Sequence, residues 1–128
     1  MDQKRAIAAL GALAQETRLD LFRLLVTVGP EGLPAGVIAE KLGVQPSSLS
    51  FHLAQLVHAS LITQRRLSRQ IIYSVDFVAV RDLLIFLTED CCGGRPEICG
   101  PLALAANRCC EPRTKERRRE TPARAYRR

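Results

Sequence analysis

All five cysteines of this chain lie in one segment near its C-terminal end. They are Cys91, Cys92, Cys99, Cys109 and Cys110, and the first ninety residues contain none. An odd number of cysteines argues against the disulfide framework of a small secreted protein. Two adjacent cysteines do not readily bond each other, because their Cα atoms are only about 3.8 Å apart. We therefore expect reduced thiols in a cytoplasmic protein, available for metal binding or redox chemistry.

The composition describes one soluble domain followed by a basic tail. The chain has 128 residues, of which 47% are hydrophobic, and its longest apolar run is far shorter than the roughly 18 residues of a spanning helix. We expect no membrane partner. The net charge of +6 is concentrated in residues 111–128, where 8 basic and 3 acidic residues leave only +1 for the rest of the chain. We expect a domain at 1–90, a cysteine-rich segment at 91–110, and a disordered basic tail at 111–128.

The periodicity of the apolar residues predicts a mainly α fold with one small β-hairpin, in the order ααααββα. The expected helices cover residues 2–14, 15–28, 34–42, 45–60 and 77–89. Two β-prone runs, 61–67 and 70–75, flank Ser68-Arg69 as a hairpin, and Gly29 to Gly32 form a loop. Pro34 and Pro46 suit the first turns of their helices, and Gly43 suits a helix end. These helices and strands determine the positions of any functional side chains among the first ninety residues.

A short helix, a glycine turn, a longer helix and a hairpin together make a winged helix-turn-helix. A helix that enters a major groove needs small polar side chains off its apolar stripe, and the 45–60 helix has six: Gln45, Ser47, Ser48, Ser50, His52 and Gln55. The hairpin carries Arg65, Arg66 and Arg69, and no acidic residue lies between Lys41 and Val75. We expect base contacts from the helix and phosphate or minor-groove contacts from the hairpin. Ser47 and Ser48 could equally serve to begin the helix, and His52 could hydrogen-bond within the fold.

Four motifs in this order resemble the ArsR/SmtB family of metal-responsive repressors. They are Thr17-Arg18-Leu19, the run Ser50-Phe51-His52-Leu53-Ala54-Gln55-Leu56, Leu61-Ile62, and Arg69-Gln70-Ile71-Ile72-Tyr73. The resemblance covers residues 5–90. It implies a homodimer paired through the first and fifth helices, bound to double-stranded palindromic operator DNA and released by a metal or metalloid. The expected interface residues on those helices are Ile7, Leu10, Leu13, Val80, Leu83, Leu84 and Leu87.

The chain departs from the family's best-known metal sites. Its third helix, which carries the family's Cys-x-Cys-type motif, has no thiol between Pro34 and Lys41. The fifth helix lacks the Asp/His set of zinc-sensing members, because the only histidines are His52 and His58. The arrangement instead resembles arsenite-responsive members whose cysteines lie just after the fifth helix. Three thiolates from Cys91, Cys92 and Cys99 suit a soft, three-coordinate ion, so we expect As(III) or Sb(III) as the inducer and no permanent cofactor.

Several alternatives stay open at this point. Cys109 and Cys110 could replace Cys99, form a second site, capture ions for transfer, or be inert, and they could supply the further ligands that cadmium, lead or zinc would need. A methylated arsenical would need only the thiolates of Cys91 and Cys92. The adjacent thiols could also form a redox switch, or the chain could be a metal-buffering protein. We do not expect a thiol-dependent enzyme. Cys91 and Cys92 lie at the C-terminal end of the expected fifth helix, where the helix dipole opposes thiolate formation.

Overall fold

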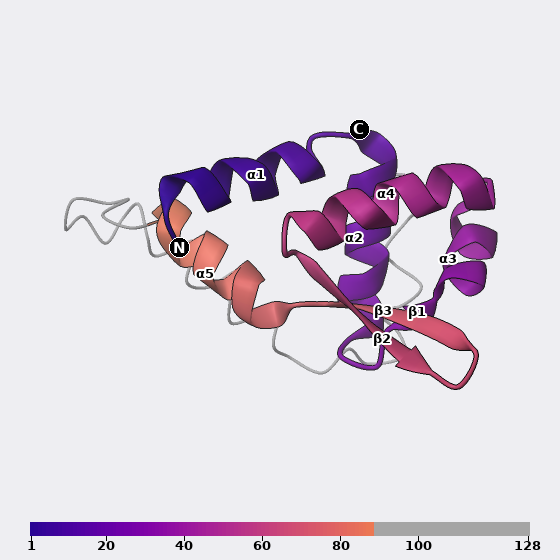
Figure 1. The fold of residues 1–128 in the computed structure, drawn as a ribbon. Helices are drawn as coiled ribbons and strands as arrows, with labels where there is room; N and C mark the ends of the chain where they lie inside the picture. Colours follow the sequence, from indigo (N-terminus) through magenta and orange to yellow (C-terminus); the bar gives the residue numbers. More distant parts are fainter. Residues whose placement is uncertain (89–128) are drawn as a thin grey trace, which may run out of the picture. The chain divides into compact units, whose positions relative to one another are not determined.

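Five helices and three strands follow one another along residues 1–88, the part of the chain that this computed structural model describes (Figure 1). In chain order they are α1 (Gln3–Leu13), α2 (Glu16–Val28), β1 (Leu33–Pro34), α3 (Ala35–Leu42), α4 (Pro46–His58), β2 (Ile62–Leu67), β3 (Gln70–Val75) and α5 (Phe77–Thr88). The predicted helices and the hairpin are therefore confirmed. The cysteine-rich segment and the basic tail lie outside the described residues. Within residues 1–88 no helix has the length and apolar character to cross a bilayer.

The helix ends follow from local side-chain chemistry. The Asp2 side chain accepts a hydrogen bond from the Arg5 backbone N–H, and the Gln15 side chain accepts one from Arg18, each at 2.8 Å. These bonds satisfy backbone donors that the first turn of a helix leaves without partners. Gly43 ends α3 in the left-handed conformation with φ +64°. Pro46 then occupies the start of α4, as the sequence predicts.

The core lies between α2, α4 and the start of the hairpin. Its largest fully buried side chains are almost all leucines: Leu21, Leu25, Ile38, Leu49, Leu53, Leu56, Leu61 and Ile62. Three of them, Leu49, Leu53 and Leu56, line one face of α4, in agreement with the predicted stripe. Figure 1 shows α2 passing behind α4, the β2–β3 hairpin reaching past the helices at one end, and α5 at the other end.

A third strand, β1, joins the hairpin and was not predicted. From the sequence we expect a loop that leads directly into α3, but Leu33 pairs with Tyr73 and Pro34 with Ile72 in an antiparallel register. The sheet order is β1-β3-β2. Pro34 consequently precedes α3 as its N-cap rather than lying in its first turn. A proline is tolerated here because β1 is an edge strand, which leaves its nitrogen without a required partner.

The chain reaches β1 through a glycine that no other residue could replace without strain. Gly32 has φ +71°, and a Cβ built on it would overlap the backbone carbonyl oxygen of Tyr73. Both the left-handed backbone and the close approach to β3 therefore require glycine at this position.

We predict that Gly32→Ala destabilises the fold by about 1–3 kcal/mol, the usual cost of forcing a non-glycine residue into such a conformation. Urea unfolding of the two proteins measures the difference. Gly36→Ala is the matched control: it lies in α3, and outside its sequence neighbours and the backbone of its own helix no atom comes within 4 Å of the position of an added Cβ, so alanine should stabilise by up to about 1 kcal/mol. Equal midpoints for wild type and Gly32→Ala would contradict the assigned role of Gly32.

Candidate nucleic-acid interface

The face of α4 that points away from the core is mostly polar and carries no acidic, lysine or arginine side chain. Five of the six residues predicted to contact DNA from this helix are exposed there: Gln45, Ser47, Ser48, Ser50 and Gln55. The sixth, His52, is half-buried. The Ser50 hydroxyl donates to the Pro46 carbonyl at 2.9 Å, so its proton is already used inside the helix and its oxygen remains available as an acceptor. The structure thus exposes five of the six predicted residues, whereas His52 is partly buried.

Phe51 also lies on this face, although it was not among the residues predicted to contact DNA. Its side chain is 58% exposed. Its ring meets the ring of His52 edge-on, with centroids 5.7 Å apart and an interplanar angle of 66°. The sequence signal was its position two residues from each of the buried Leu49 and Leu53, which places it opposite the apolar stripe.

His52 is tied to the body of the protein by Arg18 at the start of α2. The Arg18 guanidinium donates from Nε to the Ala12 carbonyl at 2.6 Å, and its Nη1 lies 3.5 Å from Nδ1 of His52. Arginine has no acceptor, so Nδ1 must accept this bond and the neutral ring must carry its proton on Nε2. The structure is therefore compatible with both roles expected for His52. One ring nitrogen forms a hydrogen bond within the fold, and the other remains available as a donor to DNA.

The β2–β3 hairpin divides its arginines between two faces. Arg65 pairs with Ile72 and Arg66 with Ile71 across the ladder. Because adjacent strand residues point to opposite faces, Arg65 shares the inner face with the buried Ile72, and Arg66 shares the outer face with the exposed Ile71. Arg65 donates to the Glu31 carbonyl at 2.8 Å, which fastens the hairpin to the loop before β1. Arg66 and Arg69 form no such bond among residues 1–88 and are the better placed to meet phosphates.

A hollow of about 300 Å³ separates α4 from the hairpin. It is lined by Ser50, Ala54, Val57, His58, Gln64 and Tyr73. No acidic residue contributes to it, in keeping with the net charge of +3 over residues 43–75. The helix, the hollow and the hairpin form a continuous surface that can accept a polyanion.

The residues predicted to form a dimer interface are only partly exposed. Ile7, Leu10, Leu84 and Leu87 lie at the surface, and Ile7 is 60% exposed. Leu13 and Val80 are half-buried against the core. Leu83 is only 5% exposed and belongs to the core of its own chain. The prediction also omitted three exposed side chains of α5: Phe77, Val78 and Ile85.

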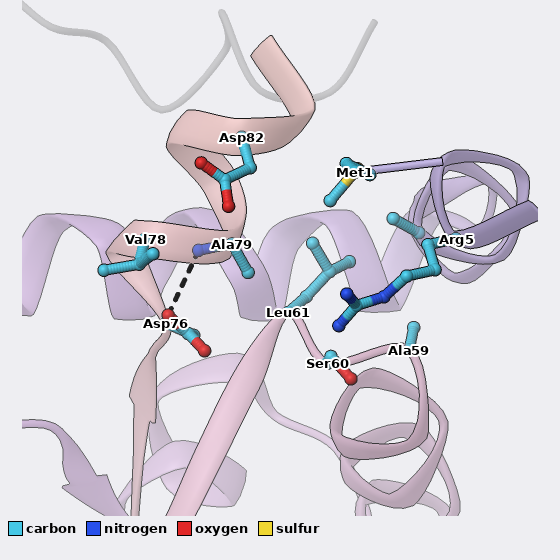
Figure 2. A pocket seen from close by; sticks show the side chains of 10 residues that line it. Met1, Arg5, Ala59, Ser60, Leu61, Asp76, Val78, Ala79 and Asp82 are labelled. Atoms are coloured by element: carbon cyan, nitrogen blue, oxygen red, sulfur yellow. Dashed lines mark hydrogen bonds between the residues drawn. The ribbon is translucent and has the colours of Figure 1, made fainter. Parts of the chain in front are cut away.

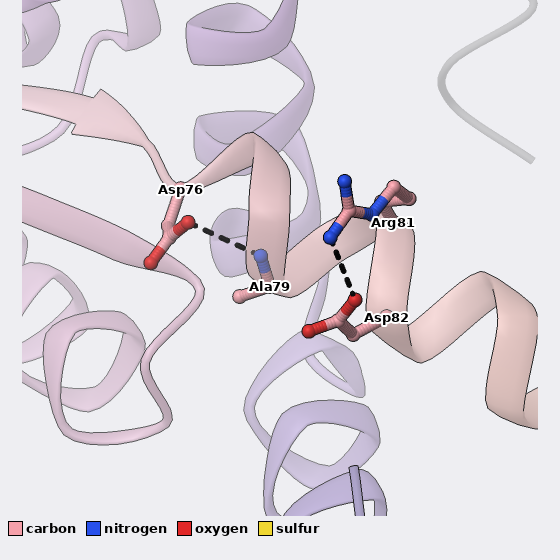
Figure 3. Close-up of polar contacts among 4 residues, drawn as sticks. All are labelled: Asp76, Ala79, Arg81 and Asp82. Atoms are coloured by element: carbon pink, nitrogen blue, oxygen red, sulfur yellow. Dashed lines mark hydrogen bonds and ion pairs between the residues drawn. The ribbon is translucent and has the colours of Figure 1, made fainter.

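The acidic side chains at the start of α5 and within it, Asp76 and Asp82, are occupied by local interactions. Asp76 accepts a hydrogen bond from the Ala79 backbone N–H at 3.1 Å, and Asp82 forms an ion pair with Arg81 at 3.3 Å (Figure 3). Both acids border a hollow of about 140 Å³ between α1, the α4–β2 turn and α5, into which Arg5 extends (Figure 2). No cluster of three or more His, Cys, Asp or Glu residues suited to a metal occurs within residues 1–88. Cys91, Cys92, Cys99, Cys109 and Cys110 lie outside the described residues.

Comparison with known proteins agrees with this geometry. Residues 13–65 match a family described as a helix-turn-helix domain. The nodulation protein NolR of Rhizobium meliloti is 34% identical over 88 residues, which are 69% of this chain and 70% of NolR. The chain belongs to the ArsR family of winged-helix transcriptional regulators. It is accordingly a DNA-binding regulator, and the enzyme alternative is excluded.

Solved structures of ArsR-type regulators show the same fold. An ArsR-like transcriptional regulator from Rhodococcus sp. RHA1 aligns with a TM-score of 0.62 at 22% identity, over 86% of this chain and 96% of its own. HlyU from Vibrio cholerae N16961 aligns with a TM-score of 0.54 at 28% identity, over 68% and 97% of the two chains. A possible transcriptional regulator for arsenical resistance aligns with a TM-score of 0.54 at 26% identity, over 62% and 79%.

The Arg18 contact predicts that neutral His52 is protonated on Nε2, and that Arg18→Ala removes this preference. The substitution should also cost about 1.5–3 kcal/mol of stability, because it deletes hydrogen bonds made by a charged group. ¹⁵N chemical shifts of the two ring nitrogens, recorded at alkaline pH, report the tautomer directly. His58, the chain's other histidine, is the internal control and should not change. A wild-type His52 protonated on Nδ1 would refute the contact.

Proposed function

We propose that this ArsR-family regulator is a cytoplasmic repressor that binds operator DNA as a homodimer and is released by As(III) or Sb(III). The observation that carries the DNA-binding half is the surface of α4 and the hairpin, which is free of acidic residues from 42 to 74. Small polar side chains on α4 fit the major groove, and Arg66 and Arg69 extend the positive surface to the flanking phosphates.

Exposed apolar side chains support the homodimer. Helix α5 is apolar over most of its circumference, yet Leu83 is its only buried residue. The exposed leucines of α5, with Ile7 and Leu10 of α1, leave apolar surface in contact with water in a single chain. Soluble monomers rarely expose a large apolar patch. A second copy presenting the same patch would cover both, and the two-fold symmetry would match a palindromic operator.

The inducer assignment rests on the donor set that follows α5. Cys91 and Cys92 come three and four residues after Thr88, and Cys99 follows a glycine-rich stretch. Three thiolates without imidazole or carboxylate suit trivalent arsenic or antimony, which accept three sulfur ligands. The similarity to a possible regulator of arsenical resistance supports this choice.

Release follows if ligand capture disturbs the end of α5 and thereby the dimer. Two recognition helices in successive major grooves are about 34 Å apart, and a changed dimer geometry alters that spacing. An allosteric coupling of about 1–3 kcal/mol would weaken operator binding roughly 5- to 150-fold.

We predict that Ile7→Asp shifts the protein from dimer toward monomer, because it buries a charge at the centre of the expected interface. Sedimentation equilibrium measures the shift, which should reach about a hundredfold in the dissociation constant if the charge costs some 3 kcal/mol. Val26→Asp places the same charge at an exposed apolar position of α2 and should leave the dimer intact. A dimer unaffected by Ile7→Asp would place the interface elsewhere.

We predict that micromolar arsenite releases the reduced full chain from its upstream DNA and that zinc does not. Fluorescence anisotropy of labelled duplex measures the release. Cys91→Ser should bind DNA as tightly as wild type and resist arsenite, because two thiolates cannot replace three. Cys110→Ser is the matched control and should respond normally.

Other outcomes identify other sensors. Loss of DNA binding in Cys91→Ser would make this thiol structural and end the inducer proposal. Release by peroxide but not arsenite would indicate a redox switch, and release by cadmium, lead or zinc would bring in Cys109 and Cys110. Release by a methylated arsenical, retained in Cys99→Ser, would indicate a two-thiolate sensor. Absence of any sequence-specific DNA affinity would favour metal buffering.

A further inference from the structure

Phe51 occupies the centre of the outward face of α4. Successive helix residues are about 100° apart, so Phe51 points away from the core, where Leu49, Leu53 and Leu56 are each no more than 1% exposed. Ser47, Ser48 and Gln55 lie one turn before or after it and share its side of the helix. A groove that accepts this face of the helix must therefore also accept the Phe51 ring.

Contact with solvent does not stabilise an aromatic side chain at this exposed position, so its presence needs another explanation. Phe51 is the one large apolar side chain exposed along α4, all of whose residues the structure describes. Many other exposed apolar side chains, among them Ile7, Leu10, Leu84 and Leu87, lie on α1 and α5, where a second copy would cover them. Phe51 is on neither helix, so the dimer does not account for it.

The ring has an aromatic neighbour within its own helix. It contacts His52 edge-on, and the His52 side chain lies beside Arg18. An aromatic side chain has only two side-chain torsions, so it loses less conformational entropy on binding than a long flexible side chain does.

We propose that Phe51 reads the C5-methyl group of a thymine in the major groove. Thymine is the one base that presents a methyl group there, and an apolar side chain is its natural partner. The ring would shield the methyl from water, while Ser47, Ser48 and Gln55 offer hydrogen bonds to neighbouring base edges. This inference rests on the proposed insertion of α4 into operator DNA.

The test replaces thymine by uracil, which pairs identically and lacks only the methyl group. The reduced full chain first selects a duplex from a randomised pool, and each thymine of that duplex is then replaced in turn by deoxyuridine. We expect one thymine per half-site whose replacement weakens wild-type binding about fourfold, the value of one buried methyl group. Phe51→Ala should bind the thymine duplex more weakly and should not distinguish thymine from uracil at that position.

Two further variants separate methyl recognition from a structural role. Phe51→Leu keeps an apolar side chain and should retain most of the thymine preference. Val26→Ala removes an exposed apolar side chain from α2 and should keep the full preference. If Phe51→Ala loses affinity equally for thymine and uracil duplexes while still discriminating between them, the ring only supports His52 and the inference is wrong. If the chain enriches no duplex at all, the DNA-binding function fails before the inference does.

Discussion

The burial of Leu49, Leu53 and Leu56 fixes the rotation of α4 about its own axis. Each is almost completely buried, and exposing a leucine costs about 1.5–3 kcal/mol. A helix with one side held this firmly can offer only the opposite side to a ligand. The small polar residues and Phe51 therefore face outward as a consequence of packing, before any contact with DNA exists.

The rotation of α4 does not by itself fix the position of the helix and the hairpin relative to the rest of the domain. Three polar links between elements do so. Arg18 joins the last turn of α1 to His52 on α4. The short pairing of β1 with β3 ties the segment before α3 to the hairpin, and it depends on Gly32 fitting against Tyr73. Arg65 fastens the hairpin to Glu31. This bond shows that a basic residue of the hairpin can be structural, whereas its neighbour Arg66 forms no such bond among residues 1–88.

Local signals made most of this architecture predictable. Asp2, Gly43 and Pro46 mark helix ends through interactions within one turn, and alternation in the hairpin needs only its own residues. Strand β1 could not be found in this way, because two residues show no period and their partner lies almost forty positions further along. The inner and outer sides of α5 were also hidden, because the helix carries more apolar residues than one face can bury and only Leu83 among them is buried. Phe51 was missed because a residue that faces the major groove was expected to be polar.

A contiguous set of hydrogen bonds connects the first turn of α5 to the C-terminal end of α4. The Leu61 N–H donates to the Leu56 carbonyl near the end of α4, and the Asp76 N–H donates to the Leu61 carbonyl. Asp76 in turn accepts from Ala79 in the first turn of α5 (Figure 3). A tilt of α5 must therefore strain these bonds or carry the end of α4 with it. Since buried leucines prevent α4 from rotating in place, the lower-energy response is a movement of α4 together with its own core. A change at α5 would then alter the separation of two recognition helices in a dimer without altering the surface that either one presents.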